Sequence, residues 1–216
     1  MPGDRFADRT EAGRLLGEDL RARGIGGEDT VVLGVPRGGV VTAAQVAEVL
    51  GAPLDVALAR KVGAPGNPEL AIGAVGPDGS AVIDEDLARR VGATAEWLTQ
   101  ATARERHEVA ERQQRFRGGR PPLDVTGRQV IVVDDGVATG STAIAVGRWL
   151  AGAGAARRIL AVPVAPPQTV RRLTEAYDDV VVLAAPPAFF AVGEFYTDFR
   201  QVTDDEVRQL LRSGDD

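Results

Sequence analysis

Two adjacent acids, Asp134 and Asp135, directly follow a run of four β-branched residues at 130–133. Such a run is typical of a buried strand, and two carboxylates buried together would repel one another. At the carboxyl end of a parallel strand they would instead stand at the rim where ligands of open α/β sheets bind. There they could accept hydrogen bonds from a pair of hydroxyl groups, such as a sugar diol.

Mostly small and hydroxyl-bearing residues follow the two acids and lead into a predicted helix over 142–151. These residues are Gly136, Val137, Ala138, Thr139, Gly140, Ser141 and Thr142. Exposed backbone N–H groups near a helix N-terminus suit a phosphate group. Together with the acids, the segment predicts a site for a ribose 5-phosphate.

The elements that must position this segment alternate along the chain. Short apolar runs predict strands at 30–35, 54–59, 130–133, 159–162 and 180–183. Helical spacing or flanking turn residues predict helices at 8–23, 41–50, 142–151, 168–176 and 203–211. Strands alternating with helices favour an α/β fold with a mostly parallel sheet.

The pattern is interrupted between the second and third of these strands. A glycine- and proline-rich loop is predicted at 61–67, and the GPDG turn predicts a hairpin between runs at 71–75 and 80–83. A polar stretch at 84–117 has a weak apolar stripe at helical spacing and predicts an inserted helical hairpin, with Gly92 between its arms. The tail at 185–200 is loop-like and rich in aromatic residues.

Composition excludes several classes of function. The 216 residues carry a formal charge of −6, so no global positive field favours nucleic acid or an anionic membrane. There is no cysteine, which removes thiolate chemistry and disulfides. We expect a cytoplasmic protein without a membrane span or a signal peptide.

Residues 130–142, VIVVDDGVATGST, resemble the thirteen-residue motif that binds 5-phosphoribosyl 1-pyrophosphate (PRPP) in type I phosphoribosyltransferases. The resemblance extends over 30–183 without the polar insertion, and the whole sequence looks like a bacterial phosphoribosyltransferase-domain family. It implies a single domain over 1–216, with a twisted, mostly parallel sheet, a helical insertion at about 84–118 and a small hood at about 185–216.

Three further segments are similar to working parts of that superfamily. The sequence GVPRGG resembles the pyrophosphate loop, which implies roles for Pro36, Arg37, Gly38 and Gly39. RKVG is similar to an Arg-Lys pair of the adenine-type enzymes, which adds Arg60 and Lys61 as pyrophosphate ligands. Residues 62–69, with the following hairpin, correspond to a flexible loop that closes over the site and excludes water.

The resemblance implies a glycosyltransferase of nucleotide metabolism that moves the phosphoribosyl group to a nitrogenous base and releases pyrophosphate. Its catalytic residues would be Asp134, Asp135, Lys61 and Arg37. Mg²⁺ is expected, held by Asp134 and Asp135 directly or through water. A homodimer is also expected, with PRPP and a small base as partners and no nucleic acid or membrane.

The acceptor base stays open. Enzymes for 6-oxopurines carry an acid where this chain has Ala138, so hypoxanthine and guanine are disfavoured. RKVG is adenine-like, but TGST and the insertion depart from that pattern. A flat base could stack on rings of the tail, although core packing or a dimer contact is the more frequent role for such rings. The candidate stacking rings are Phe189, Phe190, Phe195 and Tyr196, and Phe199 also belongs to this aromatic tail.

The alternative function is a sensor of the same fold that binds PRPP or a nucleotide without turnover. A P-loop hydrolase and a dinucleotide-binding domain are disfavoured because GxxxxGK[ST] and GxGxxG do not occur. The single histidine, His107, lies in a charged run of the insertion, where a solvated helix face explains it.

Overall fold

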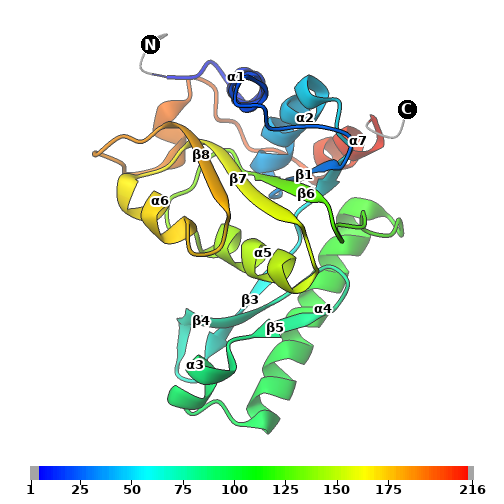
Figure 1. Ribbon diagram of the computed structural model, residues 1–216, viewed down its shortest axis with the longest axis vertical. Coiled ribbons are helices and arrows are strands. Elements are labelled where there is room, and N and C mark those ends of the chain that lie inside the picture. The colour runs from blue at the N-terminus through cyan, green and yellow to red at the C-terminus, as the bar shows by residue number, and fades with distance from the viewer. Residues whose placement is uncertain (1–4, 214–216) are drawn as a thin grey trace.

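Five parallel strands form the central sheet of the computed structural model, which describes residues 5–213 (Figure 1). They are β1 (Thr30–Gly34), β2 (Leu54–Val56), β6 (Gln129–Val133), β7 (Arg157–Val164) and β8 (Asp179–Ala184). Their order is β2-β1-β6-β7-β8, with β1 paired to both β2 and β6. The prediction of a mostly parallel α/β sheet is confirmed.

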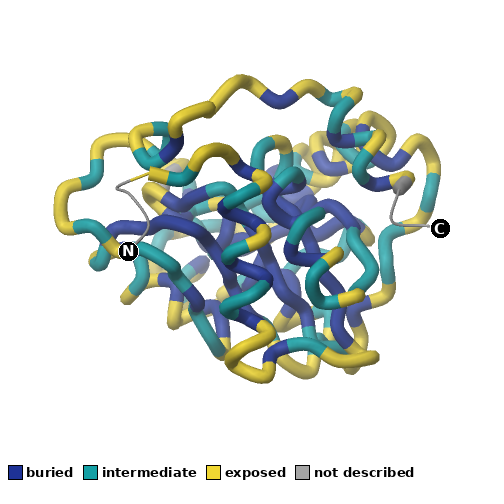
Figure 2. The backbone as a smooth tube through the Cα atoms, turned by 90° about the horizontal axis from the view of Figure 1, so that it is seen from above, coloured by how far each residue is buried: buried dark blue, intermediate teal, exposed yellow. Residues whose placement is uncertain are grey.

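Helices cover both faces of this sheet, which explains why its central strands are apolar throughout. On one face lie α1 (Arg9–Ala22) and α2 (Gly38–Leu50), and on the other α5 (Ser141–Gly152) and α6 (Pro167–Leu173) (Figure 1). Successive residues of β1 point to opposite faces, so Val31 joins the cluster with Trp149 while Val32 joins that with Leu16. Figure 2 shows the buried backbone gathered between these layers.

A second, smaller sheet is inserted between β2 and β6. Its antiparallel strands are β3 (Arg60–Ala64), β4 (Asn67–Val75) and β5 (Ala81–Ile83). The helices α3 (Glu85–Arg90) and α4 (Ala95–Arg117) follow, and α4 runs alongside this sheet (Figure 1). The expected apolar stripe packs there, because Ala101 and Val109 share a buried cluster with Val62 and Ile72.

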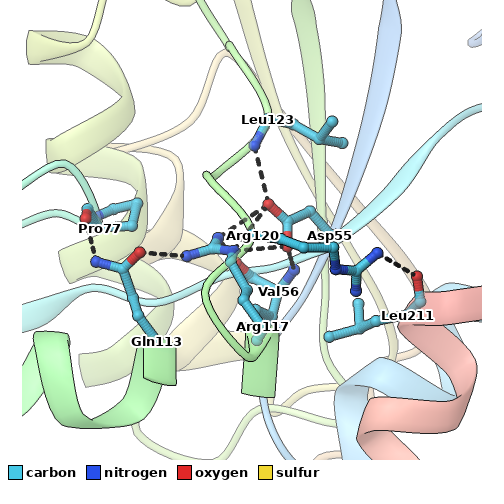
Figure 3. Close-up of polar contacts among 8 residues, drawn as sticks. All are labelled: Asp55, Val56, Pro77, Gln113, Arg117, Arg120, Leu123 and Leu211. Carbon is cyan, nitrogen blue, oxygen red and sulfur yellow. Dashed lines mark hydrogen bonds and ion pairs between the residues drawn. The ribbon is translucent and has the colours of Figure 1, made fainter. Parts of the chain in front are cut away.

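The end of α4 is fastened to the main sheet by a buried ion pair. Both Nε and Nη2 of Arg117 donate to the Asp55 carboxylate on β2, at 2.9 Å for the shortest contact of each, and Nη2 also donates to the Val56 carbonyl (Figure 3). The Gln113 amide oxygen accepts from Nη1, and the Leu123 amide donates to Asp55. A charge pair that is this fully hydrogen-bonded is tolerated inside a protein.

The sequence-based boundaries were wrong at residues 61–67. Most of this expected loop is strand, because β3 continues to Ala64 and only Pro65 and Gly66 form a turn before β4. Gly63 permits the pairing, since an added Cβ there would come within 2.6 Å of the Pro68 carbonyl oxygen. The partner strand determines this conformation, and local composition does not show it.

Two other boundaries shift by a few residues. The second strand was expected over 54–59, but β2 ends at Val56, and α2 begins at Gly38 rather than at residue 41. The C-terminal segment contains a short 3₁₀ helix, η1 (Val192–Phe195), and α7 (Asp204–Ser213). The expected cap of α7 is present, since Thr203 and Glu206 exchange hydrogen bonds.

Candidate functional site

The two loops predicted to bind PRPP meet where the strand order reverses. From β1 the chain proceeds to β2 on one side, whereas β6 is followed by β7 on the other. The carboxyl ends of β1 and β6 lie side by side, and the Val35 amide donates to the Val133 carbonyl at 2.8 Å. Ligands of open α/β sheets bind in the crevice at such a point.

Glycines allow these two loops to pack closely. A Cβ on Gly39 would come within 2.8 Å of Asp134 Cα, and one on Gly38 within 1.9 Å of Asp135 Oδ2. The preceding peptide bond, between Pro36 and Arg37, is cis. Residues 36–39 and the two acids therefore form one surface, and the first two glycines of α2 are required where the carboxylates approach.

Asp135 is held by an arginine that no motif in the sequence singles out. Arg9, the first residue of α1, donates from Nε to Asp135 Oδ2 at 2.7 Å and from Nη1 to the Arg200 carbonyl at 2.8 Å. Its guanidinium carbon lies 3.8 Å from the centre of the Phe199 ring, a cation–π geometry. The Arg9 side chain is only 10% exposed, so this pair is shielded from solvent.

The C-terminal segment supports the same acid from its backbone side. The Tyr196 hydroxyl donates to the Asp135 carbonyl, and its ring stands between those of Phe6 and Phe199. Burial, together with the charge of Asp135, raises the pKa of Tyr196, so the hydroxyl stays a proton donor. Sequence reasoning placed this tyrosine among candidate base-stacking rings, and the structure gives it a positioning contact.

Asp134 has a different environment. Its carboxyl group lies against Gly39 and accepts a hydrogen bond from the Asp135 amide at 2.9 Å. Burial, and then the negative charge of Asp135, raise the pKa of Asp134 well above its ordinary value. A carboxyl with this bias gains from a cation or a hydroxyl donor brought by a ligand.

The loop after the acids presents free backbone donors. Within residues 5–213, the amides of residues 138–142 have no hydrogen-bond acceptor, and Gly140 has a positive φ of 79° at the start of α5. Thr169 of α6 fixes the loop from behind by donating to the Ala138 carbonyl at 2.6 Å. Ala138, Thr139 and Thr142 are exposed. This arrangement can bind a phosphate group.

The three cations expected to bind pyrophosphate, Arg37, Arg60 and Lys61, have different surroundings. Arg37 is exposed and lies 3.5 Å from Asp204 of α7. Arg60 on β3 is paired with Glu105 of α4 at 2.8 Å. Because side chains alternate along a strand, Lys61 points to the opposite face of β3 from Arg60. The structure thus brings residues 36–39 and 134–142 together, but it separates the two cations of the Arg-Lys pair.

The single histidine, His107, is exposed on α4, and its Nε2 lies 3.4 Å from Glu111 Oε1. No cluster of three or more histidine, aspartate or glutamate side chains suited to a metal ion occurs in the described part of the chain. None of the helices within 5–213 is long and apolar enough to span a bilayer. Asp134 and Asp135 are two adjacent carboxylates at the end of β6, fewer than such a cluster requires.

Comparison with known proteins bears on the same residues. The model of the phosphoribosyl transferase domain family matches residues 10–199. Two Mycobacterium tuberculosis proteins, "Putative phosphoribosyl transferase MT0597" and "Putative phosphoribosyl transferase Rv0571c", are each 45% identical over 206 residues, which is 95% of this chain. The matched region spans 46% of each relative, so this chain is about half their length.

A solved structure agrees along nearly the whole chain. The crystal structure of TT1426 from Thermus thermophilus superposes with a TM-score of 0.90 and 46% identity, covering 97% of this chain and 98% of that one. The family match includes both loops at the switch point, and it begins directly after Arg9. This chain belongs to the phosphoribosyl transferase domain family.

Proposed function

We propose that this chain binds PRPP at the crevice between β1 and β6 and transfers its phosphoribosyl group to a nitrogenous base. The observation that carries the proposal is the convergence of the two loops, which places paired acids beside free backbone amides. The amides of residues 138–142 would hold the 5-phosphate, and Asp134 would accept hydrogen bonds from the ribose hydroxyls. Arg37 and the amides of Gly38 and Gly39 would face the diphosphate.

The reaction needs charge to move from C1 of the ribose to the leaving group. The bond from C1 to the pyrophosphate oxygen breaks with its electron pair on oxygen, while a nitrogen lone pair forms the new bond to C1. The acceptor nitrogen then gives up its proton to water or to the released pyrophosphate. Arg37 and Lys61 would stabilise the negative charge that develops on the diphosphate, and the fixed 5-phosphate would keep C1 in line for attack.

The two acids fit a Mg²⁺ ion that arrives with the substrate. Proteins commonly hold Mg²⁺ with one or two carboxylates together with substrate phosphates. When bound, the ion would supply positive charge that offsets the negative charge of the diphosphate. Arg9 neutralises Asp135, which leaves Asp134 as the acid with unmet charge. We therefore propose Asp134 as the principal ribose and metal ligand, with Asp135 as its support.

The acceptor side is proposed to be the C-terminal hood at about 185–216, of which the structure describes the part up to residue 213. Phe189 stacks on Phe195 at 5.2 Å between centroids, and Phe190 is 87% exposed. Tyr196 and Phe199 are engaged with Arg9 and Asp135, so Phe190 is the ring best placed to meet a base. Ala138 keeps 6-oxopurines disfavoured. A cytoplasmic homodimer, with residues 62–69 closing over the site, completes the proposal.

Calorimetry with PRPP tests the binding half. The wild-type protein should bind PRPP in the presence of Mg²⁺, and the double variant Asp134→Asn with Asp135→Asn should lose that binding while keeping its circular dichroism spectrum. Unchanged affinity in the double variant would show that these carboxylates are not ribose ligands. Pyrophosphate release across purines, pyrimidines and pyridine carboxylates tests turnover, and binding without release on any of them would instead support a PRPP sensor.

A further inference from the structure

The inserted helix α4 reaches the pyrophosphate loop through one shared acid. Asp204 of α7 lies 3.5 Å from Arg37 Nη1 through Oδ1 and 3.7 Å from Arg115 Nε through Oδ2. Both separations are too long for good hydrogen bonds. Asp204 Oδ1 is buried and has no hydrogen-bond partner within residues 5–213. One carboxylate thus balances two guanidinium groups without binding either of them closely.

A third arginine stands one turn earlier on the same helix. Arg112 and Arg115 are three residues apart and so lie on the same side of α4. The Arg112 guanidinium makes no hydrogen bond or ion pair with any side chain that the structure describes. Burial, and then the like charge of Arg60, lower the pKa of Arg112. The four arginines Arg60, Arg112, Arg115 and Arg37 outnumber the three acids that these contacts set against them, Glu105, Glu108 and Asp204.

The anchor of α4 keeps this row in place. Arg117, two residues beyond Arg115, is bound to Asp55 on β2 (Figure 3). The last residue of β2, Val56, pairs with Gly34, which is also the first residue of the GVPRGG segment. The carboxyl end of α4 is therefore fixed beside β2, next to the strand β1 that leads into the pyrophosphate loop. An arginine side chain has several rotatable bonds, so its guanidinium group can change position while the helix stays in place.

We infer that Arg112 and Arg115 of the inserted helix extend the pyrophosphate subsite, and that Asp204 holds Arg37 and Arg115 until the diphosphate of PRPP takes its place. The inference rests on the proposed function. Guanidinium groups bind phosphate oxygens in bidentate fashion, and a diphosphate carries more charge than the single carboxylate it displaces. The insertion is then a part of substrate binding.

Comparing ligands separates this inference from the proposed function. PRPP, inorganic pyrophosphate and ribose 5-phosphate are titrated calorimetrically into the wild type and into Arg115→Gln, Arg112→Gln and Asp204→Asn. Loss of a charged hydrogen bond should weaken PRPP and pyrophosphate binding by about tenfold for Arg115→Gln and somewhat less for Arg112→Gln. Ribose 5-phosphate lacks the diphosphate and should bind all variants equally. Asp204→Asn should bind pyrophosphate more tightly.

An arginine of another helix provides the matched control for these variants. Arg14→Gln removes an exposed arginine of α1 that pairs with Glu18 and should leave all three affinities unchanged. If the wild type binds neither PRPP nor ribose 5-phosphate, the proposed function fails. If it binds PRPP and the two α4 variants bind it equally well, only the extended subsite fails. If Asp204→Asn weakens pyrophosphate binding, Asp204 is not a displaced counter-ion. Unaltered ribose 5-phosphate binding shows that each variant is folded.

Discussion

Two buried arginine–aspartate pairs fasten helices to strand ends, and they differ in how completely they are satisfied. In the pair of Arg117 and Asp55, every guanidinium nitrogen donates, and the carboxylate also accepts from the Leu123 amide. In the pair of Arg9 and Asp135, a single nitrogen reaches the carboxylate, and the rest of the cation rests on an aromatic ring and a carbonyl.

The difference corresponds to the role of each pair. Among the residues that the structure describes, no other acid joins the hydrogen bonds of the Asp55 pair, so its charges cancel and its contribution is structural. The Asp135 pair adjoins the carboxyl of Asp134, whose pKa is raised. Two acids with one arginine leave unmet negative charge at the crevice, which a ligand can use. Stability is lower at a site arranged in this way.

The largest expected effect is on the structural pair. Arg117→Met leaves the Asp55 carboxylate buried without its partner, which should lower the free energy of unfolding by about 3–5 kcal/mol. Urea denaturation measures this change. As control, Arg157→Gln breaks the exposed pair with Asp179 and should cost about 1 kcal/mol or less. Equal losses in the two variants would remove the basis for calling the Asp55 pair structural.

At the pair of Arg9 and Asp135 we expect a smaller loss of stability, together with a loss of PRPP binding. Arg9→Met removes the charge beside Asp135 while preserving an apolar stem against Phe199. We expect a loss of about 1–3 kcal/mol and PRPP binding weakened at least about tenfold. Arg9→Lys keeps the charge without the planar stack and should fall between. PRPP affinity equal to wild type in Arg9→Met would mean that Asp135 needs no cation.

The smallest effect should have the opposite sign. Because the pKa of Asp134 is raised in the folded state, the native carboxyl favours its proton, and stability is lost as pH rises from the ordinary aspartate pKa to that raised value. Asp134→Asn cannot ionise, so at pH 8 it should gain on the order of 1 kcal/mol, or a melting temperature higher by about 2–4 °C. The gain should vanish in acid, near the ordinary aspartate pKa of about 4.

Thermal unfolding across that pH range provides the measurement, and the same substitution at the structural pair provides the contrast. Asp55→Asn should destabilise the protein throughout the range in which Asp134→Asn stabilises it, since it breaks the bonds to Arg117. A destabilised Asp134→Asn in mild alkali would show that Asp134 is not under electrostatic strain, and the two pairs would then no longer differ in kind.

The part of the site that was predictable from the sequence lies in contiguous segments. The strand, acids, phosphate loop and helix at 129–152 follow from a β-branched run next to small and hydroxyl residues, each of which acts within a few positions of its neighbours. GVPRGG was predictable as a turn from its proline and glycines, and its link to pyrophosphate came from resemblance to the loop of the family. Local physics determines both, and the parallel pairing of β1 with β6 then brings them together.

The contacts that support the site join residues far apart in the sequence. Arg9 and Asp135 are 126 positions apart, and Arg117 and Asp55 are 62 apart. In the sequence, Arg9 is one of several polar residues in an amphipathic helix, and Arg117 is the last residue of the polar stretch at 84–117 that predicts a helical insertion. Residues 61–63 of RKVG were expected to form a loop. They are strand because β3 pairs with β4, and that pairing depends on the fold. None of these long-range contacts produces a recognisable pattern in the neighbouring sequence.

The Asp55 carboxylate also lies where the insertion both leaves and rejoins the main sheet. It follows the start of β2, and it accepts from Arg117 at the end of α4 and from Leu123 on the way to β6. The excursion of the chain is thus a loop closed at one point. The entropic cost of closing a loop grows only slowly with its length. The insertion between β2 and β6 could therefore become longer or shorter while the strand order stays the same, provided that Asp55 keeps its partners where the insertion begins and ends.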